Sequence, residues 1–347
     1  MLGKTLAELK EIAVSCGLPS FNGAQIAQWL YQKRATSFEQ MTNLSKTARQ
    51  RLLDQGYVVG AVLPSEQHTS SDGTKKYLFP VSCSLGADGA MEDSVVEAVM
   101  IPDGDRKTLC VSSQAGCKMG CKFCMTGRQG FHGNLSAADI LSQFLYTDEA
   151  PQLTNTVFMG MGEPLDNLPE VMRTIEVLTA DWGFAWSPKR ITVSTIGVLP
   201  KLRTFLDGCK CHLAVSLHNP FPEERASLMP VQKAYSVTDV IKLLKEYDFT
   251  GQRRLSFEYT MFSGFNDDKH HADALVRLLR GLPCRVNLIR FHKIPDFPYT
   301  TVPDPLMEVF KSRLEAAGII CTIRASRGED IFAACGLLAG KHNNPQL

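Results

Sequence analysis

Three cysteines within eight residues are the feature of this chain most able to do chemistry. Cys117, Cys121 and Cys124 have the spacing CxxxCxxC. Structural zinc normally takes four protein ligands, whereas an iron–sulfur cluster held by three thiolates keeps one iron open to a substrate. Gly116 and Gly120 interrupt the run as in a loop, which is not typical of cysteines packed in a core. The spacing therefore predicts an iron–sulfur site, with structural zinc as the alternative.

Polar groups follow several of the expected strands and could surround a ligand beside that site. In the segment 159–165, two glycines would let the backbone approach a ligand, and Glu163 could accept hydrogen bonds from an ammonium group. Other polar strand ends carry Ser194 and Thr195, Ser216 and His218, and Asn287, Arg290 and His292. These positions predict a ring around one ligand, and ordinary capping of the next segment is the alternative.

Two further cysteines lie outside the triad. Cys110 falls in the strand expected just before it, and Cys335 precedes Gly336 and follows Arg324 and Arg327. Either could be a small buried hydrophobe. Cys335 is the better candidate for a reactive thiol, because a flexible glycine and nearby arginines could expose and activate it.

The composition is that of an ordinary soluble globular protein, with 44% hydrophobic and 21% charged residues. The net charge of +1 gives no global indication of nucleic-acid binding, so an RNA surface would be local, such as Arg49 with Arg51 or Arg253 with Arg254. No apolar stretch approaches the roughly 20 residues that span a bilayer, and no signal peptide is evident. We expect a cytoplasmic location, no membrane partner and reduced thiols rather than a disulfide framework.

Helices are expected in the first sixty residues and strands in the next forty. Residues 5–8 form a capping box, and further helices are expected at 23–33 and 43–53. Segments 57–63 and 76–81 are expected to be strands on either side of a turn at 70–73, followed by a strand at 94–101.

Strand and helix then alternate to the end of the chain. The expected strands are 108–113, 154–159, 190–195, 211–217, 254–262, 285–291 and 319–324. The expected helices lie near 136–147, 168–179, 236–247, 267–280 and 304–317, and the capping pattern at Ser136–Asp139 and Ser236–Asp239 indicates helix starts. Repeated βα units predict a parallel sheet, and about six units favour an incomplete (βα)6 barrel over a full eightfold one. Chemistry is then expected at the carboxyl ends of the strands, where the triad also falls.

The motifs together resemble the RlmN/Cfr family of radical S-adenosylmethionine RNA methyltransferases. They are the CxxxCxxC loop and the segments 159–165, 215–218 and 330–336, and the resemblance covers nearly the whole chain. It implies an α/β fold: an incomplete (βα)6 radical-SAM barrel at 101–340, with a helical RNA-binding domain at 1–60. A β-rich connecting extension at 61–100 and a tail at 341–347 complete this expected division.

The resemblance also implies the cofactors and the residues that hold them. Cys117, Cys121 and Cys124 match the ligands of a [4Fe–4S] cluster whose open iron binds S-adenosylmethionine, of which two molecules are used per turnover. The matching cofactor contacts are Gly162, Glu163, Ser194, Ser216, Leu217, His218 and His292. His292 stands where many members have asparagine, so the match is weakest there.

Three catalytic roles follow from the resemblance alone. Cys335 matches the cysteine that becomes S-methylcysteine, and Cys110 matches the resolving thiol that forms a transient disulfide with it. Glu97 matches the proton acceptor.

The implied activity is methylation of carbon 2 of adenine 2503 in 23S ribosomal RNA and of adenine 37 in tRNA, through a transient protein–RNA adduct. The segments 113–116 and 163–165 favour carbon 2. Methylation at carbon 8 of the same ribosomal adenine and a non-catalytic iron–sulfur RNA-binding protein are the alternatives. A reducing partner such as flavodoxin and a monomeric state are also expected.

Overall fold

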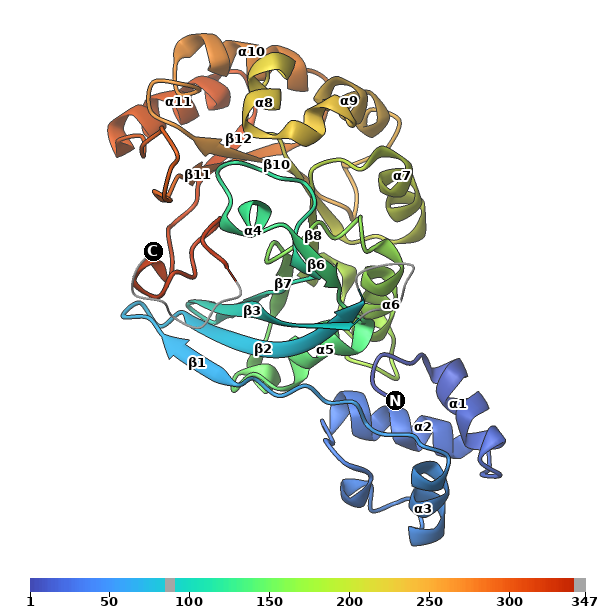
Figure 1. Ribbon diagram of the computed structural model, residues 1–347. Coiled ribbons are helices and arrows are strands. Elements are labelled where there is room, and N and C mark those ends of the chain that lie inside the picture. The colour runs from blue at the N-terminus through green and yellow to red at the C-terminus, as the bar shows by residue number, and fades with distance from the viewer. Residues whose placement is uncertain (85–90, 340–347) are drawn as a thin grey trace.

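The computed structural model describes residues 1–84 and 91–339, and its centre is one curved sheet with helices along its outer face (Figure 1). Seven strands of this sheet are parallel and adjacent, in the order β4, β7, β8, β9, β10, β11 and β12. Their bounds are β4 Arg106–Cys110, β7 Asn155–Phe158, β8 Ile191–Thr195, β9 His212–Ser216, β10 Leu255–Met261, β11 Arg285–Arg290 and β12 Ile320–Ile323.

Helices connect the successive parallel strands, as right-handed βα units require. They are α5 Ala137–Leu145, α6 Leu168–Thr179, α7 Leu199–Gly208, α8 Pro222–Leu228, α9 Val237–Leu244, α10 Lys269–Leu279 and α11 Asp304–Ala316. The chain thus makes six βα units before β12, which confirms the expected incomplete (βα)6 barrel. Ser136 caps α5 as the sequence predicted, because its hydroxyl accepts a hydrogen bond from the Asp139 amide at 3.2 Å.

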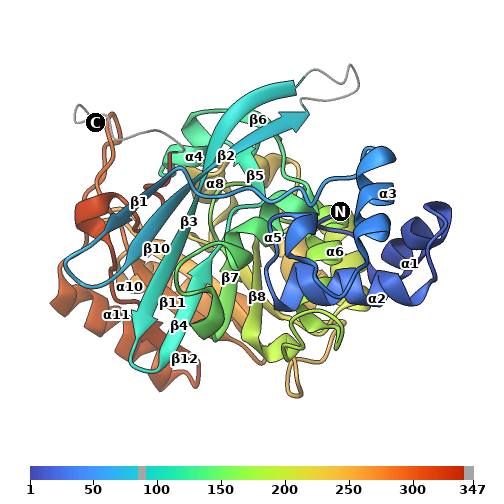
Figure 2. The same cartoon turned by 90° about the horizontal axis from the view of Figure 1, so that it is seen from below.

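Antiparallel strands extend the sheet beyond β4, and the first three of them make up the β extension. Their bounds are β1 Glu66–Thr69, β2 Lys75–Ser84, β3 Met91–Asp103, β5 Gln114–Gly116 and β6 Phe131–Asn134. Because β3 pairs with β4, the extension and the barrel share one continuous sheet. Figure 2 shows β2 and β3 as two long neighbouring strands beside the barrel. The short helix α4 (Met125–Arg128) follows the cysteine loop in the chain.

The prediction of a strand at 57–63 is wrong. This segment has no regular structure, and the strand that pairs with β2 across the predicted turn is β1. The backbone at 57–63 finds other partners: Leu2 donates to the carbonyl of Val59 at 2.8 Å, and Val62 donates to the Ser142 hydroxyl at 3.2 Å. Its apolar residues are therefore held against the N-terminus and α5 instead of a neighbouring strand.

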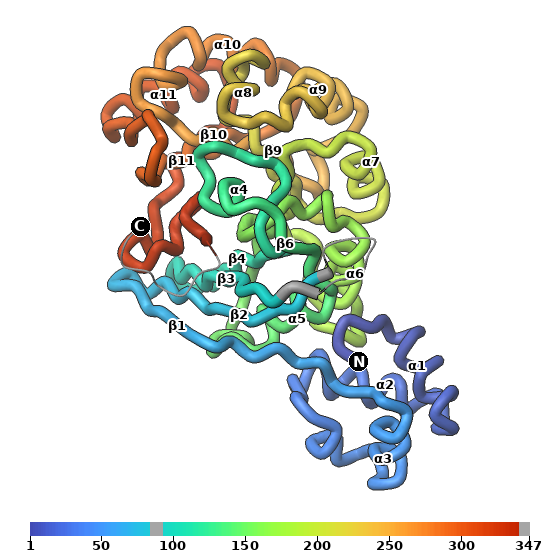
Figure 3. Tube along the Cα trace, viewed as in Figure 1, coloured from blue at the N-terminus to red at the C-terminus, as the bar shows by residue number. Residues whose placement is uncertain are grey.

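A separate group of helices lies at the N-terminus, beside α5 and α6 (Figure 3). It contains α1 Leu6–Ser15, α2 Phe21–Ala27, which continues as a wider π turn to Gln32, and α3 Lys46–Asp54. The capping box at Thr5 is confirmed, since the Glu8 amide donates to its hydroxyl at 3.3 Å and the Glu8 carboxylate accepts from its amide at 2.7 Å. Leu9, Ile26 and Leu30 form the buried centre of this group.

The expected domain limits remain predictions, and the tail at 341–347 lies outside the described residues. Among the helices of the described chain, none is both long and apolar enough to cross a membrane.

Candidate functional site

One cavity at the carboxyl ends of the parallel strands collects most of the residues singled out from the sequence. The predicted residues that line it are Cys117, Cys121, Cys124, Gly162, Glu163, Ser194, Ser216, His218 and Cys335. They come from the ends of four strands, or the loops that follow them, and from the C-terminal segment. Parallel strands bring such distant segments to one edge, which is why the predicted ring forms.

The cysteine loop runs from β5 to α4 and is anchored at both ends. Cys117 donates its amide to the Gly130 carbonyl at 2.7 Å, and the positive φ of 72° at Gly116 lets the chain turn there. A side chain at Gly116 would lie 2.1 Å from the Gly130 oxygen, so only glycine fits. Lys122 donates to the Leu228 carbonyl at 3.0 Å, which ties the loop to α8.

The three loop thiols suit a metal cluster chemically. Burial, with the neighbouring cysteines adding to it, raises the pKa of Cys117 to about 12 and the pKa of Cys121 well above its usual value. Thiols in such a site become good ligands when a bound cation releases their protons. Within residues 1–84 and 91–339, no three His, Cys, Asp or Glu side chains are grouped to hold a single ion, as structural zinc would require. The thiolates that hold an iron–sulfur cluster each bind a different iron, so they need not converge on one ion.

Glu163 provides a buried carboxylate to the wall of the cavity. Its two oxygens accept hydrogen bonds from the amides of Leu165 at 3.1 Å and Ile196 at 2.9 Å. Burial raises its pKa to about 7. The preceding Gly162 has a φ of 98°, and a Cβ there would lie 2.5 Å from the Gln114 side chain. The carboxylate is thus fixed by a turn that requires glycine.

His218 is held in one tautomer. Thr260 donates its amide to Nδ1 at 2.9 Å, so Nδ1 carries no proton. Burial, together with the charge of Arg225, lowers the pKa of His218 to about 3 and keeps the ring neutral. The remaining proton is therefore on Nε2, which is left to donate a hydrogen bond. The ring also contacts Phe123 of the cysteine loop, with 4.8 Å between the ring centroids.

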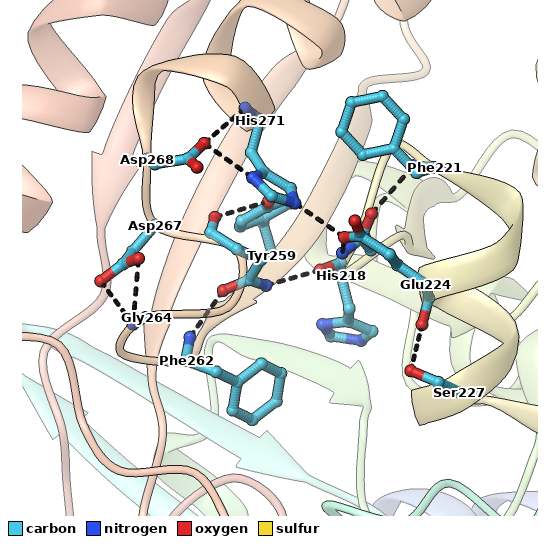
Figure 4. A network of polar contacts seen from close by, with 12 residues as sticks. His218, Phe221, Glu224, Ser227, Tyr259, Phe262, Gly264, Asp267, Asp268 and His271 are labelled. Atoms are coloured by element: carbon cyan, nitrogen blue, oxygen red, sulfur yellow. Dashed lines mark hydrogen bonds and ion pairs between the residues drawn. The ribbon is translucent and has the colours of Figure 1, made fainter.

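A polar network behind His218 fixes its backbone (Figure 4). Asn266 donates to the carbonyls of His218 at 2.8 Å and Thr260 at 2.9 Å. On the same side, His271 lies 2.7 Å from a carboxylate oxygen of Glu224 and 2.7 Å from one of Asp268, which links α8 to α10. His218, whose backbone is left-handed with a φ of 57°, is therefore held by Asn266, which precedes α10, and by Thr260 of β10.

Cys335 and Cys110 come from opposite ends of the barrel sequence. Cys335 is solvent-accessible and lines the cavity, and its neighbour Gly336 accepts a hydrogen bond from the Met125 amide at 2.8 Å. Cys110 ends β4 and is buried, outside the lining. Burial raises the pKa of Cys110 to about 12, and the nearby Cys335 thiol adds to this effect. The two thiols are therefore close enough to interact electrostatically. Cys335 is accessible to solvent, and Cys110 is buried.

Glu97 lies in β3, close to the C-terminal segment but outside the lining. It is 2% exposed, and its carboxylate lies 3.7 Å from the Lys76 ammonium, which is also buried. It also accepts a hydrogen bond from the Ala339 amide at 3.3 Å. The carboxylate thus contacts the segment that carries Cys335, four residues beyond that cysteine.

Two predicted cofactor contacts do not line the cavity. Leu217 is fully buried, and its backbone amide donates to the Glu258 carbonyl at 3.0 Å. The ring of His292 lies 3.2 Å from the Ser326 hydroxyl and 3.3 Å from a Glu329 oxygen. The cofactor contacts of these two residues remain predictions.

Glu258, which lines the cavity from β10, is not among the residues predicted from the sequence. It is 3% exposed and accepts a hydrogen bond from Asn287 at 2.7 Å. A charged residue inside an otherwise apolar strand was the available indication. The sequence suggests Arg253 and Arg254 as a local RNA surface. Arg253 is instead buried and donates to the Leu206 carbonyl at 2.6 Å, so only Arg254 is exposed.

Known proteins resemble this chain over nearly its full length. Residues 111–275 match the model of the radical SAM superfamily, and residues 1–58 match that of the ribosomal RNA large subunit methyltransferase N-terminal domain. A relative from Porphyromonas gingivalis, named "Probable dual-specificity RNA methyltransferase RlmN", is 57% identical over 98% of this chain and 96% of its own length. A "Dual-specificity RNA methyltransferase RlmN" from Syntrophus aciditrophicus is 38% identical over 97% of this chain and 95% of its own length.

A solved structure agrees with the same assignment. A radical SAM methyltransferase from Sphaerobacter thermophilus superposes with a TM-score of 0.89 at 37% identity, covering 97% of this chain and 98% of the other.

Proposed function

Since the chain belongs to the RlmN family of radical S-adenosylmethionine RNA methyltransferases, we propose that it methylates carbon 2 of an adenine in 23S ribosomal RNA and in tRNA. Family membership makes it a methyltransferase that acts on RNA and uses a [4Fe–4S] cluster and S-adenosylmethionine. The observation that carries the proposal is that the cysteine triad and Cys335 line the same cavity.

In this proposal Cys117, Cys121 and Cys124 are the cluster ligands. Their support is the spacing, the anchored loop and the soft, partly buried thiols described above. When bound, the cluster and S-adenosylmethionine supply the methyl group and a carbon radical able to remove a hydrogen atom. Radical chemistry is needed because carbon 2 of adenine has no lone pair with which to attack a methyl sulfonium.

The cavity walls hold the cofactor through a small set of polar groups. Glu163 accepts hydrogen bonds from its ammonium group, and the Nε2 proton of His218 serves as a fixed donor. Gly162, Ser194 and Ser216 line the remaining wall. Leu217 contributes through the packing of its strand end, and His292 would have to leave Ser326 to reach the cofactor.

Three residues carry the methyl group to the base and release the product. Cys335 accepts the methyl group on sulfur. The radical that the cofactor supplies would take one hydrogen atom from this methyl group, and its carbon would then bond to carbon 2 of the adenine, with the unpaired electron passing back to the cluster. Glu97 removes the ring proton, and the Cys110 thiolate attacks the Cys335 sulfur; the bond between that sulfur and the carbon breaks, the carbon takes up a proton to become the product methyl group, and a disulfide remains. Support for this pair comes from their proximity, with Cys335 accessible and Cys110 buried beside it.

The RNA and a reductant are the partners of the reaction. The helical group at 1–60 is the proposed RNA-binding accessory domain, beside the β extension at 61–100 and the barrel. The target base must leave its stack to reach Cys335. A low-potential electron donor such as flavodoxin, a monomeric enzyme and a cytoplasmic location complete the proposal.

Labelled RNA tests the proposal directly. The anaerobically reconstituted protein is given dithionite, S-adenosylmethionine and RNA whose target adenine carries deuterium at carbon 2 or carbon 8. We expect a gain of one methyl group with loss of the carbon-2 label, measured by nucleoside mass spectrometry. Loss of the carbon-8 label instead would replace the proposed position by carbon 8, and formation of no 5′-deoxyadenosine at all would favour a non-catalytic binding protein.

A further inference from the structure

Arg225 is a fully buried cation directly behind the cavity. It lies on α8, has 0% exposure and is among the largest side chains completely removed from solvent. Burial lowers its pKa to about 10, which leaves the guanidinium charged at neutral pH. A charge in this position costs several kcal/mol unless another charge or a full set of hydrogen bonds compensates it.

Its hydrogen-bond partners are all uncharged. Nε donates to the Leu217 carbonyl at 3.0 Å, and Nη2 donates to the carbonyls of Ser216 at 2.9 Å and Ile196 at 3.3 Å. Nη1 donates to the side-chain oxygen of Gln232 at 2.5 Å. Among the described residues, no Asp or Glu forms an ion pair with this guanidinium. The hydrogen bonds are satisfied, but the positive charge has no counter-charge.

The adjacent carboxylate on α8 and the carboxylate bonded to Ile196 have other partners. Glu224, the neighbour of Arg225 on α8, contacts His271 at 2.7 Å and accepts from Asn219 at 2.8 Å. Glu163 is bonded to the amide of Ile196, whose carbonyl accepts from Arg225. Cys121 of the cysteine loop is close enough to interact electrostatically with Arg225 once its thiol is deprotonated.

We propose that Arg225 is the counter-charge of the iron–sulfur centre and raises its reduction potential. This inference rests on the proposed ligation of a cluster by Cys117, Cys121 and Cys124. A cubane with three thiolates is an anion, and accepting an electron makes it more negative. A fixed cation nearby, in surroundings of low dielectric, stabilises the reduced form more than the oxidised form. Arg225 is thus a positioning residue that acts through the cluster and does not touch the substrate.

A purely structural role is the competing explanation. The guanidinium joins the segment after β8, at Ile196, to the end of β9, at Ser216 and Leu217. Removing it would disturb both, so loss of activity alone could not distinguish charge from bracing. The two roles separate only if the charge is cancelled while the hydrogen bonds stay.

Gln232→Glu cancels the charge of Arg225 while keeping its hydrogen bonds. The new carboxylate would replace the oxygen that already accepts from Arg225 at 2.5 Å and from the Val237 amide at 3.0 Å. Shape and hydrogen bonds are kept, but Arg225 becomes one half of a neutral pair. Gln232→Leu is the matched control that removes the same acceptor without adding charge. Arg225→Lys retains the charge and loses the planar fork, whereas Arg225→Gln removes the charge.

The measurement is a reductive titration of the reconstituted proteins, followed by electron paramagnetic resonance, without S-adenosylmethionine or RNA. We expect midpoint potentials of Gln232→Glu and Arg225→Gln more negative than that of the wild type, with Arg225→Lys and Gln232→Leu close to it. Glu223→Gln, which removes an exposed charge from the same helix, should not shift the potential. Iron per chain is the second readout.

The outcomes distinguish the hypotheses. An unchanged potential in Gln232→Glu, or equal shifts in Arg225→Lys and Arg225→Gln, would overturn the counter-charge. If Gln232→Glu loses iron while Gln232→Leu keeps it, the charge is again responsible; equal losses in both would mean bracing alone. Absence of iron from the wild type would instead contradict the proposed function itself.

Discussion

The two groups of thiols at the cavity are assembled in different ways. The cysteine loop at 117–124 is a short segment that is anchored near its own ends, at Gly130 and at Leu228. The pair Cys110 and Cys335 joins the first parallel strand to the C-terminal segment, so its members are neighbours only after the whole barrel has formed. The first arrangement is encoded by local spacing and the second by topology. We infer that the functions of the two groups, holding the cluster and carrying the methyl group, can be separated by mutation.

The largest effect is expected from the cysteine loop. Cys121→Ala removes one of three proposed ligands, and two thiolates cannot hold the cluster against loss. Iron per chain, 5′-deoxyadenosine formation and RNA methylation should all fall to background. Cys209→Ala, a half-buried cysteine outside the cavity, is the control and should keep all three. Normal iron content in Cys121→Ala would mean that this cysteine does not hold the cluster, and the proposed difference in function between the two thiol groups would be wrong.

Cys335→Ala should abolish methylation while leaving the cluster in place. Its side chain lines the cavity but belongs to the other thiol group, so the iron content should match that of the wild type. RNA methylation should be undetectable by nucleoside mass spectrometry, and no RNA should remain covalently attached. Turnover by this variant would contradict the S-methylcysteine route.

Cys110→Ala should stop the reaction one step later. Without the buried resolving thiol, the bond between Cys335 and the adenine is not released, and a protein–RNA adduct should accumulate. A denaturing gel, with and without ribonuclease, detects it. In the double variant Cys110→Ala/Cys335→Ala the adduct should be absent. An adduct that survives in the double variant would mean that another residue carries the methyl group.

The sequence predicts features that depend on neighbouring residues better than features that depend on residues far apart in the chain. The capping boxes at Thr5 and Ser136 depend on residues three positions apart, and both are confirmed. Helices α7 and α8 were missed because their N-cap residues, Val198 and Phe221, make no side-chain cap. Without a capping residue, the periodicity of apolar residues does not show where a helix begins.

The parts of the site that escaped prediction depend on burial. Glu258 and Arg225 are ordinary charged residues in the sequence, and only the fold makes them 3% and 0% exposed beside the cavity. Their importance comes from the cost of burying charge, which composition and spacing do not report. The neighbourhood of Cys110 and Cys335 likewise depends on the closure of the barrel, so in the sequence it rested on resemblance alone.

The smallest effect is expected outside both thiol groups, where the N-terminal helices meet the barrel. Glu8 lies 2.5 Å from Arg173 of α6, and despite the opposing effect of its partial burial, the bonds to Arg173 and Thr5 lower its pKa to about 2. Because this folded-state pKa is below the ordinary value, the stabilisation is complete above about pH 4.5 and is lost as the pH falls toward 2. For a pair about one-third exposed, Glu8→Gln should lower the free energy of unfolding at pH 7 by only about 0.5–1 kcal/mol.

Urea unfolding at several pH values measures this difference, which should shrink below pH 4.5 as the wild-type carboxylate becomes protonated. Gln40→Ala, an exposed change that removes a hydrogen bond from the Thr36 amide at 2.8 Å and involves no titrating group, is the control and should show no such pH dependence. Iron content and adduct formation in a Cys110→Ala background should be unaltered by Glu8→Gln. A change in either would mean that the N-terminal helices act on one thiol group, and the comparison would then have to include them.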